Sequence, residues 1–186
     1  VTNREAAAYR VDQALGIGLV PETHVRSGLS LGEGSVQRWD DAPEAAKAFE
    51  SDWALVDPVS WYKMAVLDLT IGNTDRHMKN FLVGKARTPA EGKLVAIDHG
   101  YSFPKNKDLR VHADQKHPED SGKSERSISD VERRALADRL RTTNWADVTG
   151  GLIHGDTLEA LKWRAKRVAD AVESNKLASA WKAARP

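Results

Sequence analysis

The chain has 186 residues, with 28 Lys and Arg against 27 Asp and Glu and a formal net charge of +1. This length suits one domain with a well-formed core, and the near balance of charge gives no reason to expect a nucleic-acid partner. A sequence without cysteine excludes disulfides, thiolate metal sites and a cysteine nucleophile. No run of about 18 apolar residues predicts a membrane helix, so we expect a cytoplasmic protein without a membrane partner.

The first predicted element is a helix over residues 2–15, which ends before Gly16. Thr2 and Glu5 have the spacing of a capping box, in which two side chains bind the free backbone N–H groups of the first turn. Two short strands follow, over residues 19–25 and 35–39, on either side of a glycine-rich turn. Pro21 places the first strand at a sheet edge. The turn lacks the G-x-x-x-x-G-K-[ST] pattern of a phosphate loop, which favours a plain hairpin.

Two helices are predicted next. A short one is expected over residues 43–49, with Pro43 in its first turn. A longer one begins after Asp57 and ends at Gly72, because glycine commonly ends a helix. Its apolar residues have helical spacing and are numerous enough for a central place in the core, so this helix can hold the following loop rigidly.

The loop after this helix leads into a predicted hairpin of strands 81–83 and 94–97. A hairpin brings the residue before its first strand and the residue after its second strand to one end, so Asn80 and Asp98 should converge. Together with Asp75 in the adjoining loop, they offer the hard oxygen ligands that Mg²⁺ prefers. The alternative for Asn80 is a turn residue that bonds its own backbone.

The second half of the chain is expected to be a long polar loop followed by helices. The loop covers residues 105–127, a second capping box at Ser129 and Glu132 starts a helix to about Leu140, and a last long helix starts near Asp156. Some residues of these helices are expected to face inward: Val131, Ala135, Leu136 and Leu140. Others are expected to form a solvated basic face: Lys162, Arg164, Lys166 and Arg167.

The pattern D-R-H-x-x-N-F, followed by a strand that ends in I-D-H-G, resembles the catalytic and metal-binding loops of the phosphatidylinositol 3-/4-kinase-like branch of the kinase superfamily. That branch includes lipid kinases, HipA-type bacterial protein kinases and secretory-pathway kinases. The opening R-E-A-A-A-Y-R, with L-V-P-E-T beyond it, also looks like the helix and strand of bacterial or phage members.

The resemblance implies an α+β fold that is mainly α: a protein-kinase-like C-terminal lobe with a small β-hairpin at the active site and a reduced N-terminal lobe. We therefore interpret residues 1–186 as a single kinase-like domain. Residues 1–42 would be the remnant of the N-terminal lobe and the hinge, and residues 43–186 the helical C-terminal lobe.

The resemblance also implies a role for each polar residue of the central loop. Asp75 would accept or orient the hydroxyl proton of the phosphoacceptor, while Asn80 and Asp98 would bind the Mg²⁺ of Mg-ATP. Arg76 would hold neighbouring carboxylates or phosphate through bidentate contacts. His77 either touches the γ-phosphate or fixes the loop through backbone carbonyls or Asp98, and we favour the supporting role.

The residues that the resemblance assigns to the nucleotide lie in the first 42 positions. Glu5 matches the glutamate that pairs with a strand lysine, the alternative being a plain capping residue. Gln37, Arg38 and Trp39 match the strand that enters the interlobe hinge, where backbone groups receive adenine; for Arg38 we favour an ordinary amphipathic strand. No residue before Glu5 matches the lysine. The chain is then a fragment, a second chain supplies the missing lobe, or the fold uses another cation.

Two functions from different classes follow. The first is an ATP- and Mg-dependent phosphotransferase, acting on protein Ser/Thr or a small hydroxyl substrate rather than on lipid, because no basic amphipathic membrane-binding face is evident. The second is a catalytically inactive binding or assembly module, a pseudokinase. The set of Asp75, Asn80 and Asp98 favours the first, and the missing lysine and glycine-rich loop favour the second. A metal-dependent hydrolase fits less well, because it would need regularly spaced histidine ligands.

Overall fold

The computed structural model describes residues 2–42, 56–84, 94–109 and 125–184. Its helices are α1 (Thr2–Leu15), α3 (Pro58–Ile71), α4 (Asp130–Thr142), α5 (Trp145–Thr149), α6 (Asp156–Glu173) and α7 (Leu177–Ala184). Its strands are β1 (Thr23–Leu29), β2 (Gly32–Gln37), β3 (Phe81–Val83) and β4 (Leu94–Ala96). This mixed and mainly helical content agrees with the expected fold class. The helix predicted over residues 43–49 and most of the predicted long loop lie outside the described residues.

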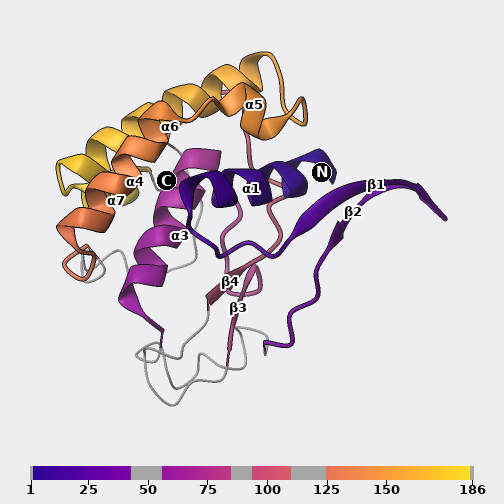
Figure 1. The fold of residues 1–186 in the computed structure, drawn as a ribbon, viewed down its shortest axis with the longest axis horizontal. Helices are drawn as coiled ribbons and strands as arrows, with labels where there is room; N and C mark the ends of the chain where they lie inside the picture. The colour runs from indigo at the N-terminus through magenta and orange to yellow at the C-terminus, as the bar shows by residue number, and fades with distance from the viewer. Residues whose placement is uncertain (1, 43–55, 85–93, 110–124, 185–186) are drawn as a thin grey trace.

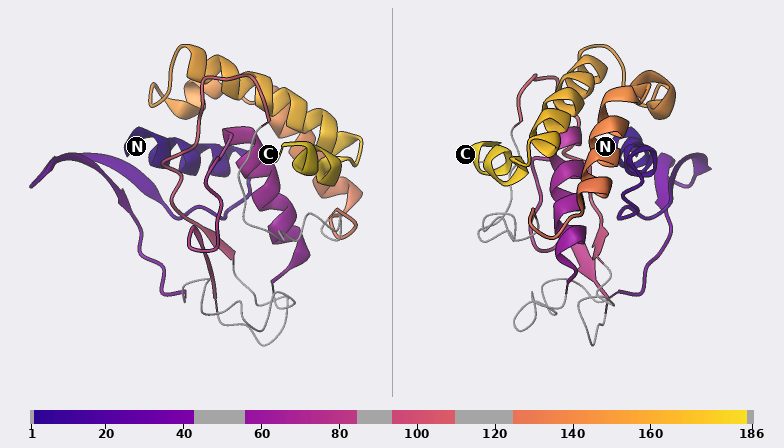
Figure 2. Two further views of the ribbon diagram at one scale, coloured as in Figure 1. Left: turned by 180° about the vertical axis from the view of Figure 1, so that it is seen from behind. Right: turned by 60° about the vertical axis from the view of Figure 1, so that its left-hand side comes forward.

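Helix α3 forms the centre of the molecule. Ten of its fourteen residues are buried, and it contacts α1 on one side and α6 and α7 on the other (Figures 1 and 2). The β3–β4 hairpin lies beside it, while the β1–β2 hairpin extends away from α1. Such an apolar helix, packed on several sides, gives a rigid support for whatever follows it in sequence.

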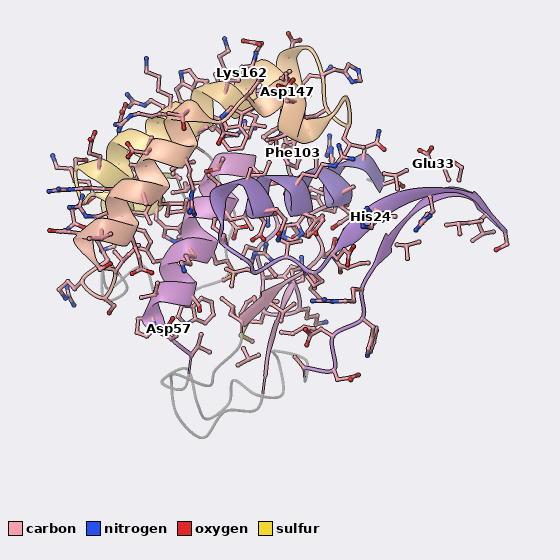
Figure 3. All side chains as sticks on the ribbon, viewed as in Figure 1. His24, Glu33, Asp57, Phe103, Asp147 and Lys162 are labelled. Carbon is pink, nitrogen blue, oxygen red and sulfur yellow. The ribbon has the colours of Figure 1, made fainter. Side chains whose placement is uncertain are left out.

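Local chemistry fixes both ends of α3 where the sequence predicts them. Asp57 accepts a hydrogen bond from the Val59 backbone N–H through Oδ1 at 3.1 Å, so it caps the helix start. Figure 3 shows Asp57 at this end of α3. Gly72 ends the helix with φ of 62°, in the left-handed region that favours glycine. A Cβ on Gly72 would also lie 2.9 Å from Cδ of Pro104, so a side chain has no room there.

The first hairpin is shifted from its predicted position. Its strands pair antiparallel around a two-residue turn, but β1 begins at Thr23 and the segment before it is not a strand. The reason is the buried carboxylate of Asp12, which accepts hydrogen bonds from the backbone N–H groups of Gly18 (3.0 Å) and Leu19 (2.9 Å). These bonds hold the connection from α1 as a turn. β1, which carries His24 (Figure 3), then contacts α1, and the His24 ring lies edge-on to the ring of Tyr9 with centroids 6.1 Å apart.

Two expectations about the later helices are wrong. Val131 and Ala135 are exposed, because α4 packs on α6 through a face that is shifted by one position and includes Leu136, Ala137 and Leu140. Arg164 was expected in a solvated face but is fully buried, since α6 packs against the end of α3. Among the helices described here, none combines the length and the apolar character needed to cross a membrane.

Candidate active site

The loop between α3 and β3 is folded by its own side chains. Asn73 Nδ2 donates to Asp68 Oδ1 at 3.0 Å, and Asn73 Oδ1 accepts from the Asp75 backbone N–H at 3.0 Å. Asn80 Nδ2 donates to the backbone carbonyl of Asp75 at 2.7 Å and lies 3.3 Å from Asp75 Oδ2. The carboxylate of Asp75 is therefore held beside the amide of Asn80.

The predicted convergence of Asn80 and Asp98 rests on the β3–β4 hairpin, which the structure contains. Phe81 pairs with Ala96 in antiparallel register, and the Ile97 backbone N–H donates to the Asn80 carbonyl at 3.1 Å. Asn80 is thus opposite the residue that precedes Asp98. Asp98 is exposed, with φ of 56°, and forms no hydrogen bond or ion pair with the other described residues.

These two residues supply few ligands by themselves. Within the described ranges, no three or more His, Asp or Glu side chains cluster in a way that could hold a metal ion. Asn80 Nδ2 is occupied by Asp75, which leaves Asn80 Oδ1 and the Asp98 carboxylate as candidate ligands. Mg²⁺ commonly takes one or two protein oxygens and fills its remaining positions with substrate phosphates and water. Two such oxygens would suffice for a magnesium ion only if it arrived with a nucleotide.

Arg76 lies behind the loop, and its side chain is buried. Nε and Nη2 of Arg76 bind the two carboxylate oxygens of Asp68, each at 2.9 Å. Nη1 donates to the backbone carbonyl of Ile97 at 3.0 Å and also to that of Asn80. Of the two partners considered for Arg76, the structure shows a carboxylate. Arg76 thus joins α3, the loop and the end of β4, and a buried guanidinium requires such pairing.

Glu5 faces His99 across the interface between α1 and the turn that follows β4. Glu5 Oε2 lies 3.5 Å from His99 Nδ1, and we find no capping-box bond between Glu5 and Thr2 in the described part of α1. Burial raises the pKa of Glu5, but His99 and the positive charge of Arg76 together hold it below its ordinary value. Sequence reasoning missed His99, although the I-D-H-G string places it directly after Asp98.

His77 supports the loop through partners other than those expected. Its Nδ1 accepts from the Lys79 backbone N–H at 3.2 Å, and its Nε2 lies 3.8 Å from Asp75 Oδ2. The expected backbone carbonyls and Asp98 are not its partners, because the loop turns tightly between His77 and Asn80, whose N–H bonds the His77 carbonyl at 2.9 Å. The His77 ring therefore lies beside the Asp75 carboxylate.

A cavity of about 460 Å³ adjoins this end of the β3–β4 hairpin. Its wall combines the segment that leaves β2 with residues of the hairpin and of the loop before it: Pro21, Gln37, Arg38, Trp39, Asp40, Ala42, Lys79, Leu82 and Ile97. Gln37, Arg38 and Trp39 thus share one cavity with the residue next to Asp98. Trp39 is 84% exposed, and Lys79, which sequence reasoning did not assign, adds a positive charge to the wall.

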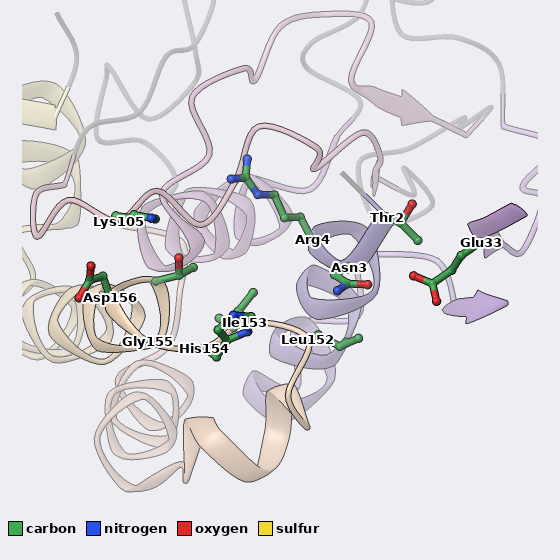
Figure 4. Close-up of a pocket in the computed structure, with 11 residues that line it drawn as sticks. Thr2, Asn3, Arg4, Glu33, Lys105, Leu152, Ile153, His154, Gly155 and Asp156 are labelled. Carbon is green, nitrogen blue, oxygen red and sulfur yellow. The ribbon is translucent and has the colours of Figure 1, made fainter. Parts of the chain in front are cut away.

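A second cavity, of about 580 Å³, lies between the first turn of α1 and residues 152–157 (Figure 4). Lys105 and Glu33 also line it, and Arg4 from its wall donates to the Gly100 carbonyl at 3.1 Å. It contains none of the residues assigned to catalysis, metal or nucleotide. The cavity beside Trp39 is therefore the better candidate for a nucleotide.

In the candidate site, a helix-supported loop and a hairpin carry the polar residues. Residues 59–121, about a third of the chain, match the family model described as Phosphatidylinositol 3- and 4-kinase. This match covers α3 from its second residue on, the loop with Asp75 and Asn80, and the β3–β4 hairpin with Asp98.

Two curated relatives from Arabidopsis thaliana are similar over a shorter stretch. Phosphatidylinositol 4-kinase gamma 2 is 47% identical over 47 residues, and Phosphatidylinositol 4-kinase gamma 3 is 44% identical over 43 residues. These stretches cover 24% and 23% of this chain and 8% of each relative. The comparisons support the phosphatidylinositol 3-/4-kinase superfamily, and they do not extend to the HipA-type or secretory-pathway kinases.

Proposed function

We propose that the chain is the catalytic part of an ATP- and Mg-dependent phosphotransferase of the phosphatidylinositol 3-/4-kinase-like superfamily. One observation carries this proposal: the β3–β4 hairpin ends at Asn80 and Ile97, next to Asp98, and the same end opens into the cavity lined by Trp39. This arrangement would put a nucleotide base, the two proposed oxygen ligands and the Asp75 carboxylate at one end of the hairpin.

The roles divide along the cavity. The hinge-like segment with Gln37, Arg38 and Trp39 would receive the base, and Asn80 Oδ1 and the Asp98 carboxylate would hold Mg²⁺, which neutralises phosphate charge during transfer. Asp75 would accept the proton of the attacking hydroxyl or orient that hydroxyl, and its contact with Asn80 keeps the two halves of the site in register.

For the acceptor we infer a hydroxyl group on a protein Ser/Thr or a small molecule. The two plant relatives are named as phosphatidylinositol 4-kinases, but each match covers only 8% of the relative, so it does not carry their acceptor over to this chain. The exposed apolar side chains of the β1–β2 hairpin, Leu29, Leu31 and Val36, offer a surface for further strands of an N-terminal lobe, from the same protein or from a second chain.

A pseudokinase is the second candidate, and one observation favours it. Glu5, the match to the glutamate that pairs with a lysine, has His99 as its ion-pair partner among the described residues. A module of this kind would bind nucleotide or a partner protein without turnover.

A melting curve with Mg-ATP tests the proposed function. Mg-ATP at millimolar concentration should raise the Tm, because a ligand that binds only the native state stabilises it. Asp98→Asn should remove this shift, whereas Asp138→Asn, on the exposed side of α4, should retain it. An unchanged Tm in the wild type would refute nucleotide binding, and a shift without phosphoryl transfer to any hydroxyl, or to water, would favour the pseudokinase.

A further inference from the structure

The imidazole ring of His99 connects α1 with the buried centre of the site. His99 Nδ1 lies 3.5 Å from Glu5 Oε2, and His99 Nε2 lies 3.0 Å from Arg76 Nη2. A guanidinium nitrogen only donates, so Nε2 accepts this bond, and the ring proton is assigned to Nδ1. That proton faces the carboxylate of Glu5. His99 therefore accepts on the side of the loop and donates on the side of α1.

From Arg76 the contacts continue to the backbone of the proposed catalytic residue. Arg76 holds both oxygens of Asp68, whose Oδ1 also accepts from Asn73 Nδ2 at 3.0 Å. Asn73 Oδ1 then accepts from the Asp75 N–H at 3.0 Å. His99, Arg76, Asp68 and Asn73 are all buried, so each broken bond would leave an unsatisfied polar group in the interior. A change in one hydrogen bond of this buried network should therefore affect the others.

The contact between His99 and Glu5 is the longest in this series. His99 Nδ1 is buried and forms no hydrogen bond of normal geometry in the described chain, so the Glu5 carboxylate at 3.5 Å is the acceptor that faces it. The energy of this contact depends on the position of α1, because a hydrogen bond from Nδ1 to the Glu5 carboxylate requires a shorter distance than 3.5 Å. The orientation of the ring thus depends on where α1 lies.

We propose that His99 is a positioning residue that couples the position of α1 to the geometry of the loop carrying Asp75 and Asn80. Its effect on turnover rests on the proposed phosphotransferase function, whereas its effect on the loop does not. A ring held by Glu5 keeps Arg76 aligned, and Arg76 in turn holds Asp68, the Asn80 carbonyl and the Ile97 carbonyl.

Three variants test this coupling by amide hydrogen exchange. Glu5→Gln removes the charge that faces His99, and His99→Phe keeps a ring but removes both nitrogens. Glu22→Gln is the matched control, because Glu22 forms a similar pair with His24 at 2.9 Å on the exposed β1–β2 hairpin. The Asp75 and Asn80 amides should exchange about tenfold faster in the first two variants and at the wild-type rate in the control.

Exchange in α6 separates coupling from a general loss of stability. The proposal requires the α6 amides to exchange at the wild-type rate in Glu5→Gln, an isosteric change at a side chain that is 13% exposed. Unchanged exchange of the Asp75 and Asn80 amides, or an equal acceleration in α6, would overturn the proposal.

Turnover provides the second readout. Both single variants should lower kcat by about tenfold with KM for ATP within about threefold, and the double variant should be no slower than His99→Phe alone, because both changes break one connection. His99→Gln, which restores an acceptor toward Arg76, should recover part of kcat. Additive losses would overturn the coupling. A loop that responds in an inactive wild type would leave the coupling intact and refute the phosphotransferase function.

Discussion

Arg76 and Asp68 form a bidentate ion pair, with both N···O distances at 2.9 Å and both side chains excluded from solvent. The pair links the central helix α3 to the loop that follows it. Because both side chains are buried, the pair supports the loop from the side of the core.

Replacing Arg76 by lysine should be severely destabilising. Lysine cannot reproduce the planar fork, so part of the Asp68 carboxylate and the backbone carbonyls that Arg76 binds would lose their partner. We expect Arg76→Lys to lower the free energy of unfolding by about 3–5 kcal/mol in urea denaturation. Arg141→Lys, in the partly exposed pairs with Asp170 and Glu173, should cost less than about 1 kcal/mol. Equal costs would contradict the buried role of Arg76.

Asp75→Asn should separate chemistry from binding. The backbone carbonyl of Asp75 still accepts from Asn80 in this variant, so the loop keeps its main hydrogen bond. Loss of the carboxylate should reduce kcat by about 10²–10⁴-fold, measured as phosphate transfer from labelled ATP. The Tm shift with Mg-ATP should persist. Loss of both would show that Asp75 serves the metal or the fold instead.

Trp39 should report on the nucleotide directly. Its exposed indole lies in the wall of the cavity, where an adenine could stack on it. Trp39→Ala should weaken Mg-ATP binding by about 1–3 kcal/mol in calorimetry, the usual contribution of a stacked base. Trp163→Ala, on α6 beside Arg167, is the control and should bind as the wild type does. Unchanged affinity in the Trp39 variant would show that the base binds at another site.

Gly72→Ala should destabilise the chain more than Gly151→Ala, although both glycines have a left-handed backbone conformation. Gly72 and Gly151 both have positive φ, 62° and 77°, but a Cβ on Gly72 meets Pro104 and Arg164 whereas a Cβ on Gly151 meets open space. We expect about 1 kcal/mol for Gly151→Ala and about 2–4 kcal/mol for Gly72→Ala in urea denaturation. Similar values would mean that Pro104 and Arg164 can shift at little cost in free energy.

The stability that Glu5 contributes should depend on pH in a defined direction. Because the folded-state pKa of Glu5 is lowered, the unfolded state binds its proton more readily, and the stabilisation is fully present above the unfolded pKa of 4.5. It is lost as the pH falls through the folded value. The difference in Tm between wild type and Glu5→Gln should therefore be largest near pH 7 and shrink below pH 4.5; a difference that grows on acidification would reverse the assignment.

Local pattern was sufficient to predict α3, its two ends and the β3–β4 hairpin, because capping side chains, glycine and strand alternation act over a few residues. The burial of Arg164 was not predictable in this way. Its partners are the carbonyls of Thr70, Pro104 and Asn106, far away in sequence, and helical periodicity alone makes Arg164 look like its basic neighbours.

The candidate site divides in the same manner. The position of Asn80 opposite Ile97 follows from hairpin geometry, whereas the partner of Glu5 required the packing of α1 against the turn after β4. Lys79 was missed because a lysine before a strand has no pattern that distinguishes it from a solvated residue. The partner of Glu5 and the place of Lys79 in the cavity wall therefore depend on long-range packing, which sequence periodicity does not report.

The buried Arg164 has a consequence for the order in which the protein becomes competent during synthesis. Its Nε donates to the Thr70 carbonyl at 3.0 Å, at the end of α3 where the loop begins, and burial lowers its pKa to about 10. A nascent chain released only as far as α4 carries every residue assigned to metal and nucleotide, yet lacks this brace. Nucleotide binding on the ribosome should thus await the emergence of α6.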